Sequence, residues 1–111
     1  MEFLALQFPF TKRGFRHELV ARQGLICLVR RTRIYPDGDT GPSHFEVVKL
    51  RQNAERIAPN GTLLPAAEAC PSSESWGRNG WTYNTEARAL YKYRLLVRRL
   101  DPGAFQVRRA A

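Results

Sequence analysis

The chain has few of the residues on which metal sites and nucleophilic catalysts depend, with two cysteines and two histidines in 111 residues. Cys27 and Cys70 lie far apart in the sequence, so neither belongs to the short cysteine pairs of a structural zinc site. We expect both to be free thiols that pack as small hydrophobic groups, with a disulfide as the alternative if the fold brings them together. The sequence predicts no bound metal and no cofactor.

The two histidines are His17 and His44, and only His44 has a carboxylate at a useful spacing. Residues two apart in a strand point to the same side, so His44 and Glu46 could form an acid–base pair or part of a metal site. No third ligand, no Ser-His-Asp order and no phosphate-binding glycine loop accompanies them. We interpret them as a polar pair on the solvated face of a sheet, and we expect no catalytic residues and no enzymatic activity.

Long hydrophobic runs are also absent, since none approaches the roughly 18–20 residues that a membrane-spanning helix needs. Residues 1–6 lack both the basic flank and the apolar length of a signal peptide. We therefore expect a soluble cytoplasmic protein that has no membrane partner.

A composition of 43% hydrophobic and 25% charged residues is typical of a folded protein. The length suits one domain, since domains commonly have about 100–150 residues. We expect residues 1–111 to form a single domain with an ordered core from about residue 8 to residue 100 and soft ends.

Glycine and proline divide the chain into segments that predict an α+β fold. We expect an antiparallel meander of three to four strands, with one C-terminal amphipathic helix packed on one face. Residues 15–35 form its first hairpin, with Gln23-Gly24 as a two-residue turn. That turn would pair Ala21 with Ile26 and Leu19 with Leu28. The core face of the hairpin would then hold Phe15, Leu19, Ala21, Ile26, Leu28 and Ile34.

Three further segments complete the predicted sheet and its connections. Residues 36–42 are too rich in glycine and proline for a strand and predict an exposed loop. Residues 44–50 predict a third strand, and residues 62–64 a short return strand after the turn at 59–62.

The helix is expected from Asn84 or Thr85, either of which is a good N-cap, to about Leu100 before the stop signal at 101–103. Its apolar residues recur at the spacing of one buried stripe. The stripe consists of Ala89, Leu90, Tyr93, Leu96, Val97 and Leu100.

Residues 65–83 have little periodicity and hold both tryptophans. Long irregular connections are uncommon in compact domains and are often functional. We expect Trp81 and Tyr83 to close the core beside the helix. For Trp76, which is followed by a glycine and Arg78, core packing and stacking on a partner both remain open.

The net charge of +8 is concentrated near the C-terminus. Residues 84–111 hold seven basic residues against Glu86 and Asp101. A field of this kind attracts phosphate backbones and acidic protein surfaces, and arginine can grip phosphate with two parallel hydrogen bonds.

The order of residues 45–51, 65–68 and 71–83, followed by a helix, resembles a group of small uncharacterised proteins of phages and other mobile elements. The resemblance covers most of the chain between Phe15 and Leu96 and implies the cytoplasm of a bacterial host cell. It supplies no catalytic residues, because no activity is assigned to the group.

The features above favour a small, basic, non-catalytic binding protein, and first of all a nucleic-acid-binding accessory factor. The alternative is an inhibitor that binds a host defence nuclease, as an anti-CRISPR-like or other anti-defence protein does, through an acidic protein or ribonucleoprotein surface. A third alternative holds a nucleotide between subunits. The residues expected to contact the partner are Arg31, Arg33, Trp76, Arg78, Arg88, Lys92, Arg94, Arg98 and Arg99.

The predicted hairpin is apolar on both faces near its turn, through Val20, Leu25, Cys27 and Val29. One helix cannot cover two faces of a sheet. Either residues 65–83 fold over the second face or a second subunit does, and we favour the homodimer.

Overall fold

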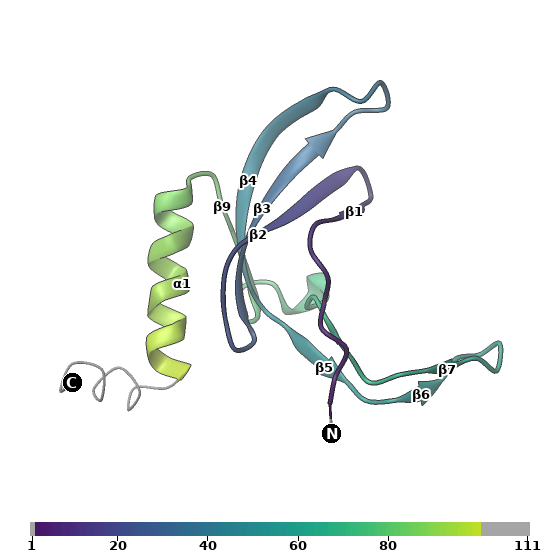
Figure 1. Ribbon diagram of the computed structural model, residues 1–111. Helices are drawn as coiled ribbons and strands as arrows, with labels where there is room; N and C mark the ends of the chain where they lie inside the picture. The colour runs from purple at the N-terminus through teal and green to yellow at the C-terminus, as the bar shows by residue number, and fades with distance from the viewer. Residues whose placement is uncertain (1, 101–111) are drawn as a thin grey trace.

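The computed structural model describes residues 2–100. An antiparallel five-stranded sheet carries one helix against one of its faces (Figure 1). The sheet contains, in spatial order, β1 (Phe10–Lys12), β2 (Phe15–Gln23), β3 (Ile26–Ile34), β4 (Thr40–Lys49) and β9 (Gly80–Tyr83). The helix is α1 (Glu86–Leu100). The predicted α+β class is confirmed, and the sheet is larger than expected because β1 and β9 extend it at its two edges.

A long excursion between β4 and β9 forms a two-stranded arm that projects away from the sheet (Figure 1). At its base β5 (Arg51–Asn53) pairs with β8 (Ala67–Ala69), and further out β6 (Arg56–Ile57) pairs with β7 (Leu63–Leu64). The tip is the predicted turn, in which the amide of Ala58 donates to the carbonyl of Thr62. The predicted return strand exists, and its partner is the arm itself rather than the sheet.

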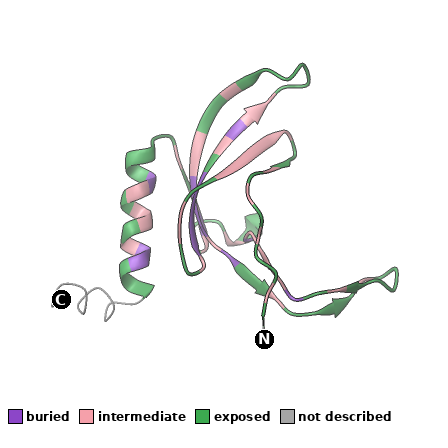
Figure 2. Cartoon of the chain, in the orientation of Figure 1, coloured by how far each residue is buried: buried purple, intermediate pink, exposed green. Residues whose placement is uncertain are grey.

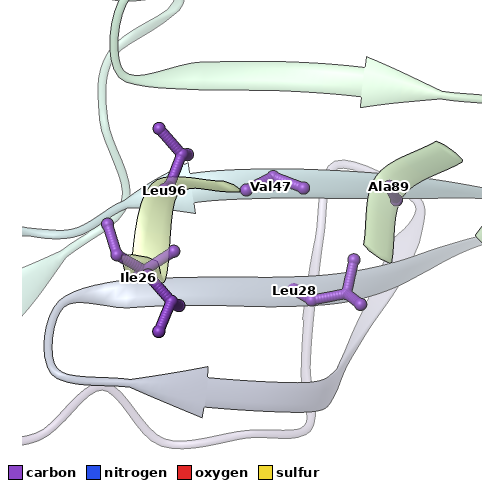
Figure 3. Close-up of a cluster of buried hydrophobic side chains, with 6 residues drawn as sticks. Ile26, Leu28, Val47, Ala89 and Leu96 are labelled. Atoms are coloured by element: carbon purple, nitrogen blue, oxygen red, sulfur yellow. The ribbon is translucent and has the colours of Figure 1, made fainter. Parts of the chain in front are cut away.

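The central strand β3 is apolar on both faces near the β2–β3 turn, because successive side chains of a strand point to opposite sides. Ile26 and Leu28 pack with Val47 against Ala89 and Leu96 of α1 (Figure 3). The alternate residues form a second cluster on the other face, which consists of Cys27, Val29, Val48 and Leu50. The most deeply buried segments in Figure 2 are these central strands and the inner side of α1.

The chain itself covers the second apolar face. Leu6, Phe8, Leu25 and Cys70 pack against the cluster on this face. The N-terminal segment is held there by the backbone, since the amide of Leu4 donates to the carbonyl of Ala66 and the amide of Glu68 donates to the carbonyl of Leu4. Of the two expected ways to cover this face, the described residues show a cover from the same chain, but Cys70 is its one packing residue from segment 65–83, and the N-terminal segment supplies Leu6 and Phe8, which was not expected. The homodimer stays a prediction.

The predicted register of the first hairpin is wrong. Gln23 pairs with Ile26, so the two-residue turn is Gly24-Leu25. Gly24 has a φ of 58° and Leu25 is not at positive φ, which is the pattern of a hairpin turn with glycine at its first central position. A bulge between Leu19 and Ala21 then shifts the pairing, so that Leu19 faces Val29. Leu19 therefore lies on the face opposite α1, as does Phe15, and only the predicted residues nearer the turn reach the helix side.

The strand β4 begins at Thr40, so the prediction that residues 36–42 form only a loop is wrong for the last three. The turn is confined to Tyr35–Asp39, where the amide of Tyr35 donates to the carbonyl of Asp39. Gly41 lies inside the strand directly beneath Tyr35, and a Cβ at this position would come within 2.8 Å of the Tyr35 hydroxyl, so a larger residue would displace that ring. Pro42 lies in a bulge of the β3–β4 pairing, where its missing N–H costs no ladder hydrogen bond.

The helix agrees with its prediction in bounds and in most of its buried face. The amide of Arg88 donates to the hydroxyl of Thr85 at 3.4 Å, which confirms Thr85 as the N-cap. Ala89, Leu96 and Val97 are buried, and Leu90 and Tyr93 pack at the edge of the same cluster. Leu100 is half exposed instead of buried. The stop signal at 101–103 lies outside the described residues.

Leu28→Ala should destabilise the protein by about 2–5 kcal/mol, because it removes a fully buried side chain from between the sheet and α1. Urea unfolding followed by circular dichroism measures the change. Leu63→Ala is the matched control, since Leu63 is 56% exposed in the arm, and should shift stability by less than about 0.5 kcal/mol. Equal losses in the two variants would contradict the assignment of the core.

Candidate functional site

A cleft of about 610 Å³ lies on the face of the sheet opposite α1. Strands β1 to β4 and β9 form its floor, and the N-terminal segment with residues 68–76 forms its wall. Its lining includes Phe10, Lys12, Arg13, His17, Arg31, Glu46, Val48, Glu68, Cys70 and Trp76. The volume is in the range of small-molecule sites, which is about 300–1,000 Å³.

Arg31 is the central cation of the cleft. Its Cζ lies 3.7 Å from the centre of the Phe15 ring, and the Cζ of Arg33 lies 5.1 Å from the same ring. The nearest carboxylate is that of Glu46, whose Oε2 is 3.6 Å from Nη1 of Arg31, longer than a hydrogen bond. Among residues 2–100 no side-chain hydrogen bond of the Arg31 guanidinium is found, so the group is positioned by stacking on Phe15 and by its ion pair with Glu46, and it has donors left for an anion.

The prediction of a solvated His44–Glu46 pair is wrong for the carboxylate. Glu46 is buried on the cleft face beside Arg31, and burial raises its pKa, partly opposed by Arg31. His44 is half-buried on the same face, opposite Arg31 in the β3–β4 ladder. In the described part of the chain, no three His, Cys, Asp or Glu side chains are placed to hold a metal ion together.

His17 and Phe10 form an aromatic stack in the cleft. Their rings are nearly parallel, with centroids 4.5 Å apart and an interplanar angle of 7°. Burial lowers the pKa of His17, and the positive charge of Arg31 lowers it further. The imidazole is therefore neutral at pH 7 and adds an aromatic surface instead of a charge.

Trp76 follows the short helix η1 (Ser73–Ser75) and lines the cleft. Its Nε1 donates to the hydroxyl of Thr82 at 3.0 Å, and its six-membered ring covers Gly80 so closely that any Cβ there would collide with it. These contacts fix the indole while leaving 38% of the residue exposed. The sequence left core packing and stacking on a partner open for Trp76; the structure shows a ring that is held at the surface, and stacking on a partner stays a prediction.

Trp81 lies on the other face of the sheet, because it is on β9 at the alternate position. It packs with Tyr83 against the core beneath α1, as the sequence predicts. The Nζ of Lys92 lies 4.2 Å from the centre of the Trp81 ring. Lys92 is therefore half-buried against the core and is not a free cation of the helix surface.

A partly buried ion pair joins the wall of the cleft to its floor. The carboxylate of Glu68 accepts from Nη2 of Arg22 at 2.5 Å and from the amide of Leu6 at 3.0 Å. The hydrogen bond from Arg22 lowers the pKa of Glu68. The negative charge of Glu68 is thereby neutralised within the protein.

Cys27 and Cys70 are free thiols, as expected. Cys27 is fully buried beneath the cleft, and burial raises its pKa to about 11. Cys70 is half-buried, and burial raises its pKa too. Neither thiol is activated as a nucleophile, since activation requires a lowered pKa.

The predicted contact residues fall on two surfaces. Arg31 and Trp76 meet in the cleft, with Arg33 beside it, and Arg78 is exposed in the turn before β9. The exposed residues of α1 lie on the other side of the sheet, and they are Arg88, Arg94, Arg98 and Arg99. The sheet therefore separates the arginines of β3 from those of the helix.

The residues of the cleft that the sequence did not predict as contact residues include Phe10, Lys12, Arg13 and His17. Three of them belong to β1 and its turn, a segment with no strand signal beyond the glycine of the turn. Arg13 and Gly14 both have positive φ, at 52° and 80°, as a tight two-residue hairpin turn requires. The Arg-Gly pair before Phe15 is the one sequence feature that could have located this edge strand.

Comparison with models of protein families, with curated proteins and with solved structures found no match for this chain. Among residues 2–100, no helix has the length and apolar character needed to cross a membrane.

The unfolding free energy should fall as the pH is lowered from 7.5 to 5.5. The unfolded chain takes up a proton at the ordinary histidine pKa of about 6.5, whereas the lowered pKa of folded His17 resists protonation, so acid favours unfolding. His17→Phe keeps the stack on Phe10 and removes this titration, so its stability should depend less on pH over that range.

Urea unfolding at several pH values gives the difference between the two proteins. The raised pKa of Glu46 has the opposite effect, because protonation of this carboxyl by acid favours the folded state. Both proteins contain Glu46, so this effect cancels in the comparison. Parallel stability curves for the wild type and His17→Phe would show that His17 does not resist protonation in the fold.

Proposed function

We propose that the protein is a non-catalytic nucleic-acid-binding accessory factor that contacts phosphates through the exposed face of α1. The observation that carries this proposal is the lack of internal partners for the arginines of that face. Among residues 2–100, the four salt bridges involve Arg16, Arg22, Arg30 and Arg31, and none involves α1. Glu86 is the single acidic residue of the helix.

The length of the basic face suits a phosphate backbone. Arg88 and Arg99 are eleven residues apart, which is about 16 Å along a helix at 1.5 Å per residue. Several successive phosphates of one strand fit that span, since they are about 3.4 Å apart along the duplex axis. The planar guanidinium groups present paired donors to each phosphate, and a rigid helix keeps them in place.

A second candidate function, inhibition of a host nuclease by protein binding, is favoured by the arm. Ile57 and Leu63 are 66% and 56% exposed and lie opposite each other in the β6–β7 pair. Paired apolar side chains on a projecting ribbon are typical of a protein contact. The resemblance to phage and mobile-element proteins is consistent with either function.

The double variant Arg94→Gln/Arg98→Gln should weaken binding and its salt dependence. Fluorescence anisotropy with labelled single- and double-stranded oligonucleotides, from about 50 to about 200 mM salt, gives the slope of log affinity against log salt. Loss of two phosphate contacts should reduce that slope by about 2 for a duplex. Arg51→Gln/Arg56→Gln removes the same charge from the arm and should change the slope little.

Equal effects of the two double variants would show a general charge effect and would overturn the helix site. Failure of the wild type to bind any oligonucleotide at low salt would overturn the function itself.

The arm provides the discriminating measurement for the second candidate. If the protein is an inhibitor, Ile57→Ser/Leu63→Ser should abolish a pull-down of a host nuclease from nuclease-treated lysate, and Arg94→Gln/Arg98→Gln should not. Retention of the partner by the arm variant would contradict a contact through Ile57 and Leu63.

A further inference from the structure

The cleft is a second candidate site, and it differs in chemistry from the basic face of α1. The helix presents charge, whereas the cleft combines cations with aromatic rings around a volume of about 610 Å³. The sheet separates the two surfaces. An inference about the cleft therefore does not rest on the function proposed for the helix.

One part of the cleft is suited to an anion. Lys12 and Arg13 are exposed at its rim, and among the described residues neither has an acidic partner. The tight turn at Arg13-Gly14 fixes that rim relative to the sheet. Further in, Arg31 is held against Phe15 and is 3.6 Å from its carboxylate neighbour. Three cations thus line the cleft, two of them without a counter-charge.

The acidic residues of the cleft do not cancel this charge. Glu68 is already paired with Arg22 and with the backbone at Leu6. Glu46 lies beside Arg31 and forms an ion pair with it, with Oε2 3.6 Å from Nη1. Both carboxylates are thus paired with arginines, and the positive charges of Lys12 and Arg13 at the rim are left to attract an anion.

Another part of the cleft is suited to a flat aromatic group. Trp76 is fixed by its hydrogen bond to Thr82 and by Gly80, so little conformational entropy is lost when a ring stacks on it. The stacked rings of His17 and Phe10 also line the cleft. Aromatic side chains of this kind stack on nucleobases with a gain of about 1–3 kcal/mol per base.

We propose that the cleft binds a nucleobase that carries a phosphate, with the base stacked on Trp76 and the phosphate held by Lys12, Arg13 and Arg31. The shared chemistry of base and phosphate has two sources, a free mononucleotide and the terminal nucleotide of a single strand. A ligand with only one of the two groups satisfies only half of the site.

Isothermal titration calorimetry with AMP, GMP, CMP and UMP tests the proposal on the full chain. Adenosine and ribose 5-phosphate are the two half-ligands. At least one mononucleotide should bind about tenfold or more tightly than either half-ligand. Absence of mononucleotide binding, or equal affinity for adenosine and AMP, would overturn the proposal.

Variants locate the binding to the two parts of the cleft. Trp76→Leu and Lys12→Gln/Arg13→Gln should each weaken mononucleotide binding by about tenfold, whereas Trp76→Phe, which keeps an aromatic face, should weaken it less. Circular dichroism checks that each variant is folded. Lys12 and Arg13 are exposed, so their double variant is expected to disturb the fold less than Trp76→Leu. Unchanged affinity in both the Leu and the Gln variants would place the ligand elsewhere and overturn the proposal.

Matched controls come from the opposite side of the molecule. Tyr91→Leu removes an aromatic side chain that is 72% exposed on α1, and Arg94→Gln/Arg98→Gln removes two charges there. Neither should alter mononucleotide binding. If these control variants weaken mononucleotide binding as much as the cleft variants do, the ligand binds at the helix and the proposal is overturned.

Oligonucleotides distinguish the two sources. In the Arg94→Gln/Arg98→Gln background, one single-stranded oligonucleotide is compared with 5′-phosphate, with 3′-phosphate and without a terminal phosphate. Tighter binding of one phosphorylated end, lost in Trp76→Leu, identifies a strand terminus as the ligand, whereas tighter binding of the mononucleotide identifies the free nucleotide. If the unphosphorylated strand binds as tightly as the phosphorylated strands and the mononucleotide, the proposed role of the phosphate is overturned.

Discussion

Burial of the two apolar faces of β3 determines how the rest of the chain is arranged. Ile26 and Leu28 point to one side and Cys27 and Val29 to the other, so the strand is stable only if both faces are covered. One amphipathic helix can cover one face, and α1 does so. The other face is covered by the N-terminal segment and by residues at the base of the arm, which are joined to each other by backbone hydrogen bonds.

The N-terminal segment and the base of the arm cover only part of the sheet face opposite α1. The cleft lies where that covering ends. The covering segments are anchored near the β2–β3 turn, where Leu6 and Cys70 pack on the apolar cluster and Glu68 binds Arg22. Further along β3, the same face carries Arg31 and Arg33. An apolar segment over these residues would remove their charges from water, which costs free energy. Polar and aromatic side chains therefore line an open space at the point where the core ends.

The same geometry separates the positive charge into two surfaces with different properties. On α1 the arginines are exposed and have no partners within residues 2–100, so they can meet an extended run of phosphates. In the cleft the cations lie beside Trp76 and the Phe10–His17 stack, which suits a compact ligand with a ring. The two surfaces therefore suit different parts of a nucleic acid, the phosphate backbone on α1 and a base in the cleft.

The sequence by itself determined the α+β class and the bounds of the helix, because periodicity and capping are local properties of the chain, and it predicted the core position of Trp81. It left Asn84 and Thr85 open as N-caps, and the hydrogen bond from the amide of Arg88 decides for Thr85. The sequence did not determine the register of the first hairpin, since the turn lies at Gly24-Leu25 instead of Gln23-Gly24 and a bulge between Leu19 and Ala21 shifts the pairing beyond it. It also did not show that Trp76, His17 and Arg31 share one cleft, because these residues come from three separate segments. Only the tertiary structure decided that, since covering the second face of β3 is what brings those segments together.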